Sequence, residues 1–205
     1  MRFDVLLPGS TIFIPGSVDA PSSTVTMLKD ESRTILIDPG NLPSIPFLEQ
    51  ALVEKEIEPG QVTDILLTHF HMDHAFNSIF FKNATVHLHE SYSTRNYKRF
   101  GPIVGQLYTN ILNSWKKIEV FENKLLWKTI RVIETPFHSR DHVSFFINTE
   151  NKGNVFLCGD ICPRQINYYE MKKGMHTDQA SEIVLHYAKK ADLIVFPHDE
   201  PISRR

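Results

Sequence analysis

One short segment, His69–His74, constrains this sequence more than any other. Its pattern His-x-His-x-Asp-His places four side chains of the kinds that ligate metals within six residues. The apolar run Val62–Leu67 precedes the segment and predicts a buried strand, and the run Ala75–Phe81 that follows it predicts a helix. The four side chains therefore lie on a loop at the carboxyl end of a strand, where α/β folds gather their ligand sites.

The spacing inside this segment indicates how the ligands are divided. His69, His71 and Asp73 alternate along the chain, so they can project to one side of the loop. His74 begins the following helix and turns the other way. This arrangement can serve two neighbouring metal ions rather than one. Imidazole suits zinc, iron and similar divalent metals, and the carboxylate adds negative charge and can also handle protons.

Three more ligand-type residues, His138, Asp160 and His198, each come just after an apolar run that predicts a strand. These runs are Ile130–Glu134, Val155–Cys158 and Leu193–Phe196. Taken alone, each histidine could be a surface residue and the aspartate a turn former. Because all three share the same position at a strand end, one common site explains them better than three unrelated loops.

The remaining pattern predicts an α/β fold. Apolar runs separated by Pro, Gly and Ser open the chain and predict an antiparallel meander with strands at Phe3–Leu7, Thr11–Ile14, Thr24–Leu28 and Thr34–Ile37. Helices are predicted at Ile45–Ile57, His89–Tyr97 and Asp178–Lys190, and further strands at Ala84–Leu88, Ile118–Phe121, Val143–Asn148 and Asp192–Phe196. Residues 99–116 have no assigned element and are a candidate for a substrate-facing cap or loop. This order predicts two packed sheets with helices outside, a four-layer αββα sandwich.

Length and charge narrow the class of protein. The 205 residues fit a single domain, residues 1–205, that is large enough for a sizeable core. A formal net charge of -2 provides no global positive field to capture nucleic acid or anionic membrane. The two cysteines, Cys158 and Cys162, are expected to be reduced thiols. No signal peptide and no apolar run of about 18 residues is recognisable, so we expect a cytoplasmic protein with no membrane contact.

The motifs together resemble the metallo-β-lactamase superfamily, over nearly the whole chain. The resemblance runs from the strand and turn Thr34–Gly40 through His69–His74 to Pro197-His198. It implies that the first metal is held by His69, His71 and His138, the second by Asp73, His74 and His198, and that Asp160 bridges both. It also implies that Asp38 hydrogen-bonds a ligand histidine from behind, although Asp38 could equally cap the turn before Pro39-Gly40.

The resemblance implies a hydrolase with two divalent metal ions, zinc by preference, with iron or manganese also compatible. A bridging hydroxide would attack an ester, thioester, lactone or phosphodiester, and Asp73 would act as the catalytic carboxylate. The expected partner is a small-molecule substrate, with nucleic acid left open. His142 also lies near the site, and we expect it to be structural because every metal position is filled without it.

Three alternatives remain. The first alternative is a ribonuclease of the same fold. It is suggested by the segments Asp141–Ser144 and Gly159-Asp160, which resemble a short single-domain animal branch of the superfamily, and this branch is associated with RNA cleavage. A mononuclear iron persulfide dioxygenase and a non-catalytic binding module are the others. Ala75-Phe76-Asn77 replaces the Gly-Gly of glyoxalase II-like members, which disfavours glutathione thioesters. The commonest class of true β-lactamases lacks a histidine at the position that matches His74. The presence of His74 in this chain therefore disfavours antibiotic hydrolysis.

Substrate-facing residues are harder to assign. Arg140 could meet an anion at the rim, but a solvated arginine is the simpler interpretation. Tyr168 and Tyr169 could donate to an oxyanion or could equally serve packing. A second group interleaves basic and aromatic residues, Tyr92, Arg95, Tyr97, Lys98, Arg99 and Phe100. Such a pattern can bind single-stranded nucleic acid, but a solvated helix face is the simpler interpretation.

Overall fold

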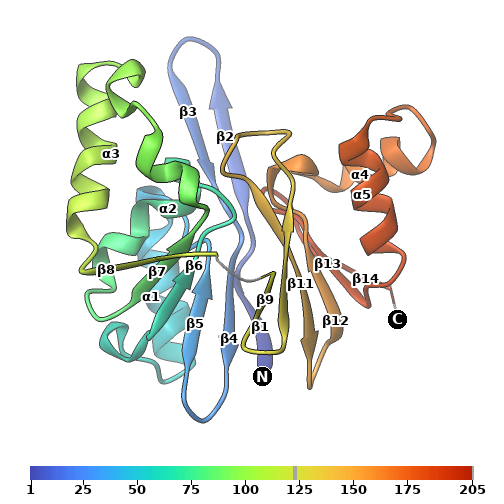
Figure 1. The fold of residues 1–205 in the computed structure, drawn as a ribbon, viewed down its shortest axis with the longest axis horizontal. Coiled ribbons are helices and arrows are strands. Elements are labelled where there is room, and N and C mark those ends of the chain that lie inside the picture. The colour runs from blue at the N-terminus through green and yellow to red at the C-terminus, as the bar shows by residue number, and fades with distance from the viewer. Residues whose placement is uncertain (122–123, 205) are drawn as a thin grey trace.

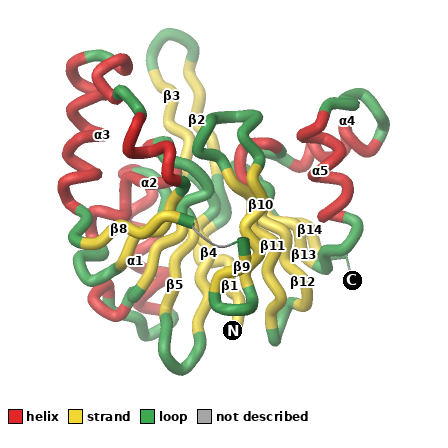
Figure 2. Tube along the Cα trace, viewed as in Figure 1, coloured by secondary structure: helices red, strands yellow, loops and turns green. Residues whose placement is uncertain are grey.

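Two six-stranded sheets packed face to face form the centre of the protein (Figure 1). The computed structural model describes residues 1–121 and 124–204. In Figure 2 the helices cover the two outer faces, with α1, α2 and α3 beyond one sheet and α4 and α5 beyond the other. The predicted four-layer αββα sandwich is therefore confirmed.

The first sheet has the strand order β1-β4-β5-β6-β7-β8. Its strands are β1 (Arg2–Leu7), β4 (Val25–Lys29), β5 (Thr34–Ile37), β6 (Asp64–Leu66), β7 (Thr85–Leu88) and β8 (Lys117–Val120). The pairs β1–β4 and β4–β5 are antiparallel, whereas β5 to β8 run parallel. Parallel neighbours need crossover connections, and these carry α1 (Ile45–Glu54), α2 (Met72–Ala75) and α3 (Pro102–Ser114).

The second sheet has the order β14-β13-β12-β11-β10-β9. Its strands are β9 (Leu125–Leu126), β10 (Ile130–Glu134), β11 (Val143–Thr149), β12 (Gly153–Leu157), β13 (Leu193–Val195) and β14 (Ile202–Ser203). Only the pair β12–β13 is parallel among these described pairings, and its crossover contains α4 (Gln165–Lys172) and α5 (Gln179–Ala188). The carboxyl ends of β6, β10, β12 and β13 thus carry the loops on which the predicted ligands lie.

Alternation along the strands explains how the layers pack. Leu36 and Ile65 belong to the core beneath α1 and α3, whereas Ile37 and Leu66 belong to the core between the two sheets. Successive side chains of a strand point to opposite faces, so a continuous apolar run fits a strand that is covered on both sides. A third core lies beneath α5, where Val184 packs near Phe156.

The structure corrects several boundaries. Residues 18–22, which lie between two predicted strands, form a strand of their own: β3 (Val18–Ser22) pairs with β2 (Ser10–Ile14) in a separate hairpin. Pro21 fits there because a two-stranded ribbon has an open edge. Helix α1 ends at Glu54 rather than at Ile57, because Glu56 adopts a positive φ of 57°.

The segment around residues 89–116 also differs from the prediction. In place of a helix at His89–Tyr97, two 3-10 turns form, η4 (Glu90–Thr94) and η5 (Tyr97–Phe100). Residues 102–114 form α3 and are not an irregular cap; Pro102 stands at its first position, where proline is preorganised for a helix. The predicted helix at Ala75–Phe81 is instead the short α2 followed by the 3-10 turn η3 (Phe76–Phe80).

The short strands β9 and β14 and the helix α4 were not predicted from the sequence. The remaining short turns are η1 (Leu42–Ser44), η2 (Pro59–Gln61) and η6 (Gly159–Ile161). Among the helices within 1–121 and 124–204, none combines the length and apolarity needed to cross a membrane.

Candidate metal centre

The seven ligand-type residues that the sequence singles out converge at one edge of the sandwich in two adjoining groups. The first group is His69, His71 and His138, and the second is Asp73, His74, Asp160 and His198. In each group, one ligand atom per residue lies within 4.8 Å of the others. Four separate chain segments supply them: the loop and helix after β6, and the loops after β10, β12 and β13. The strand-end pattern thus predicted a real spatial cluster.

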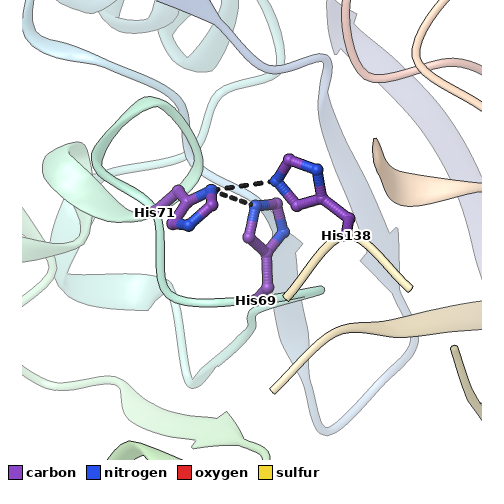
Figure 3. Close-up of side chains that lie close together, drawn as sticks. All are labelled: His69, His71 and His138. Carbon is purple, nitrogen blue, oxygen red and sulfur yellow. Dashed lines mark hydrogen bonds between the residues drawn. The ribbon is translucent and has the colours of Figure 1, made fainter. Parts of the chain in front are cut away.

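Three imidazole rings of the first group point toward one another (Figure 3). Nδ1 of His71 lies 2.9 Å from Nε2 of His69 and 3.0 Å from Nε2 of His138. His69 is buried, His71 is half-buried and His138 is exposed. The group is therefore anchored in the fold on one side and reachable from solvent on the other.

The second group combines two carboxylates with two imidazoles. Nε2 of His74 lies 3.0 Å from Oδ1 of Asp160 and 3.4 Å from Oδ2 of Asp73, and Nε2 of His198 lies 3.4 Å from the same Asp73 oxygen. The other oxygen of Asp160, Oδ2, lies 3.4 Å from Nε2 of His138 in the first group. The Asp160 carboxylate therefore stands between the two groups.

Two deeply buried atoms of this cluster, Nε2 of His74 and Oδ1 of Asp160, have no hydrogen-bond partner among the described residues. They are close to each other, at 3.0 Å, yet their geometry is not aligned for a hydrogen bond. Leaving a buried polar atom unpaired costs about 1–3 kcal/mol, and native proteins leave few of them. A divalent cation among these nitrogen and oxygen ligands would satisfy both atoms, so the residues present fit a metal.

The charges of the cluster are strongly coupled. Burial disfavours a charged His74, but nearby carboxylates, Asp160 foremost, outweigh burial and raise the pKa of His74 well above its ordinary value. Burial likewise opposes ionisation of Asp160, but the neighbouring His74 and His198 outweigh burial and hold the pKa of Asp160 well below its usual range. Burial lowers the pKa of His69 strongly, and that of His71 to about 4. The neutral rings of His69 and His71 beside the ionised Asp160 form an electrostatic setting that suits a cation.

Asp38 supports His74 from behind, as the resemblance implied. Its Oδ2 lies 2.9 Å from Nδ1 of His74, and it also accepts from the backbone N–H and the hydroxyl of Thr68, at 2.8 and 2.7 Å. The residue follows β5 with a positive φ of 49°, a strained conformation for a non-glycine residue. These contacts fix the His74 ring with Nε2 toward the cluster. Sequence reasoning missed Thr68, whose only signal was its position next to His69.

His142 has a more direct link to the site than we expected. Its Nε2 accepts from the backbone N–H of Asp160 at 2.9 Å, and its Nδ1 lies 2.7 Å from the hydroxyl of Thr135. Burial lowers the pKa of His142 to about 3, so the ring is neutral. Gly159 makes room for it, because a Cβ there would collide with the His142 ring. These contacts support the predicted structural role, in which His142 holds the turn that bears Asp160.

The candidate substrate-facing residues differ in whether they reach the metal centre. Arg140 is exposed, and Tyr168 packs toward Phe196 in the core beneath α5. Tyr169 is exposed on α4, with the amine of Lys173 over its ring. Arg95, in contrast, reaches the first group of histidines. These positions give no support to an oxyanion role for the two tyrosines.

Comparison with known proteins identifies relatives over nearly the full length. A family model described as Metallo-beta-lactamase superfamily matches residues 18–198. A curated relative, metallo-beta-lactamase domain-containing protein 1 of Xenopus laevis, is 23% identical over 201 residues, or 96% of this chain and 79% of the relative. The resemblance to the metallo-β-lactamase superfamily, and to an animal protein with a domain of this kind, is therefore confirmed.

Two solved structures extend the comparison. A provisionally assigned metallo-beta-lactamase of Thermotoga maritima is 42% identical and superposes with a TM-score of 0.93, the match covering 98% of each chain. A dizinc quorum-quenching lactonase superposes with a TM-score of 0.67 at 18% identity, over 89% of this chain and 74% of the lactonase. At this identity the second likeness is one of fold alone.

Proposed function

Because the chain belongs to the metallo-β-lactamase superfamily and is a hydrolase of that family, we propose that it works with two divalent metal ions. The observation that carries the proposal is the pair of adjoining ligand groups with two unpaired buried atoms between them. In this proposal His69, His71 and His138 hold one metal, and Asp73, His74 and His198 hold the other. Asp160 is shared, which is supported by its two oxygens facing different groups.

Bound metals of this kind supply Lewis acidity, which polarises the substrate oxygen and lowers the pKa of water toward about 7. The chain itself contributes charge and proton handling. Burial opposes ionisation of Asp73, but His74 outweighs it and lowers the pKa of Asp73, which stays an anion at neutral pH. Asp73 Oδ2 lies at the junction of His74 and His198 and can accept a proton from attacking water and return it to the leaving group.

We propose zinc as the metal because the ligands are all nitrogen and oxygen, as suits zinc, with iron and manganese compatible. The dizinc lactonase with the same fold supports this choice. The substrate class is a small ester, thioester, lactone or phosphodiester. A single domain over residues 1–205 and a cytoplasmic location complete the proposal, the latter supported by two buried free cysteines, Cys158 and Cys162.

Metal analysis of protein purified without added metal, paired with a hydrolase panel, tests the proposal. The panel holds a nitrophenyl ester, a thioester, an acyl homoserine lactone, bis-nitrophenyl phosphate and single-stranded RNA. We expect about two metals per chain and hydrolysis that a chelator removes and added zinc restores. One iron per chain with oxygen uptake on glutathione persulfide, or full metal content without hydrolysis of any substrate, would contradict it.

A further inference from the structure

Arg95 brings a permanent positive charge to the edge of the proposed metal centre. It follows η4, and its side chain is 23% exposed. Its Nη1 lies 3.3 Å from Oδ1 of Asp141, and its Nη2 lies 3.3 Å from Nε2 of His71. The guanidinium also lies over the ring of Phe100, 5.1 Å from the ring centroid. These contacts hold the planar group in one orientation beside His71.

The tautomer of His71 decides what this contact means. Its Nδ1 faces the Nε2 atoms of His69 and His138, at 2.9 and 3.0 Å. An imidazole nitrogen that ligates a metal carries no proton, so a neutral ring then carries its proton on the other nitrogen. With a metal held as proposed, Nε2 of His71 is a hydrogen-bond donor, and the guanidinium of Arg95 is always one. Two donors cannot bond to each other, so Nε2 of His71 and Nη2 of Arg95 each need an acceptor.

Asp141 accepts from Arg95, and none of its described hydrogen bonds is with His71. Its Oδ2 accepts from the backbone N–H of Phe70 at 2.7 Å, and its Oδ1 faces Nη1 of Arg95. The residue is 4% exposed and is therefore held in place. Within the described part of the chain, the hydrogen-bond contact of His71 Nε2 is with Arg95. An acceptor from outside the protein, water or a ligand, would then satisfy both N–H groups.

We propose that the guanidinium of Arg95 and the Nε2–H of His71 form a subsite for an oxyanion, a carboxylate or phosphate group carried by the substrate. The inference rests on the proposed function and narrows it to substrates with a negative charge close to the bond that is cleaved. Charge-assisted hydrogen bonds to a preoriented guanidinium are strong and directional. Phe100 and Asp141 restrain Arg95 before the substrate arrives, so less side-chain freedom is lost on binding.

The test compares the metal-loaded wild type with Arg95→Gln and with Arg99→Gln, an exposed arginine on the neighbouring turn η5. Calorimetric titration with inorganic phosphate and, separately, with acetate measures oxyanion affinity without turnover. We expect Arg95→Gln to weaken binding of at least one anion about tenfold or more, as for the loss of a charged hydrogen bond. Arg99→Gln should leave both affinities unchanged. The anion with the larger loss distinguishes phosphate from carboxylate chemistry.

Metal content and melting temperature of the same samples separate lost binding from lost folding, because Arg95 also pairs with Asp141. Arg95→Lys keeps the charge without the planar fork and should recover part of the affinity. Equal affinities for wild type and Arg95→Gln, or an equal loss in Arg99→Gln, would overturn the subsite. Failure of the proposed function has a different signature, since the wild type itself would then lack two metals or hydrolyse nothing.

Discussion

Two buried histidines near β6 lie among carboxylates, but only one of them has an atom left unpaired. His87 lies beside Asp64 at the beginning of β6, with Nε2 2.7 Å from Oδ1 of Asp64 and Nδ1 3.5 Å from Oε2 of Glu119. His74 follows the end of the same strand and has Nδ1 2.9 Å from Oδ2 of Asp38. Its Nε2 has no hydrogen-bond partner in the part of the chain that the structure describes.

The cluster around His87 balances its own charges. Oδ2 of Asp64 accepts from the hydroxyl of Thr63 at 2.7 Å and lies 3.8 Å from Nε of Arg33. Glu119 is paired with Lys117 at 2.7 Å. The side chains around His87 pair with one another and support the fold, whereas the unpaired nitrogen and oxygen of His74 and Asp160 lie among further ligand-type side chains and fit a cation. Residue types alone do not separate the two cases, since both combine histidine with aspartate.

The largest difference between the clusters should appear when each loses its aspartate. Asp160→Ala removes the carboxylate that faces both ligand groups, so we expect metal content to fall below two and hydrolysis to drop to background. Asp64→Ala should keep both metals and most of the activity while lowering stability. Metal analysis and initial rates measure the pair. Full activity in Asp160→Ala would refute its shared role.

A smaller loss of metal affinity is expected when Asp38, which hydrogen-bonds the proposed ligand His74, is replaced. Asp38→Asn keeps the size of the side chain but weakens its hold on His74, so metal affinity or activity should fall about 10- to 100-fold. Asp64→Asn makes the same exchange beside His87 and is the matched control. Titration with a competing chelator measures the affinity. If the two variants lose metal affinity equally, the contrast between the clusters is wrong.

The clustering of the seven proposed ligands was predictable from the sequence because its signal is local. Each of the seven follows a strand, and the residue types at that position carry the chemistry. The contacts of Arg95 could not be read in the same way, because its partners Asp141 and His71 stand 46 and 24 positions away. The same holds for His142, whose contact with Asp160 spans 18 positions and depends on how two strand ends meet.

The fold was predictable where apolar periodicity is strong and less so where tertiary contacts override propensity. Helix α3 carries Gly105 in its interior, which lowers helix propensity and hides the element in the sequence. The structure shows why glycine stands there: a Cβ would lie 2.6 Å from the carbonyl oxygen of Tyr97. Likewise, β3 contains Asp19 and Pro21, which disfavour a strand, yet pairing with β2 holds it.

The smallest effect concerns stability alone and its dependence on pH. Burial opposes ionisation of Asp64, but hydrogen bonds from His87 and Thr63 outweigh it and hold the pKa of Asp64 below its usual value of 3.8. A lowered folded-state pKa gives stability that is present above the unfolded value and lost as pH falls through the folded one. Asp64→Asn should therefore lower the free energy of unfolding by roughly 1 kcal/mol at neutral pH.

That deficit should shrink below about pH 4, where the wild-type carboxylate becomes protonated as well. Urea unfolding at pH 7, 5 and 3.5 measures the difference between wild type and Asp64→Asn. Rates on the best substrate at pH 7 should match, because no proposed ligand contacts this cluster among the described residues. A deficit that stays constant with pH would show that Asp64 acts through its shape and not its charge, and a loss of metal would show that the two clusters are coupled through β6.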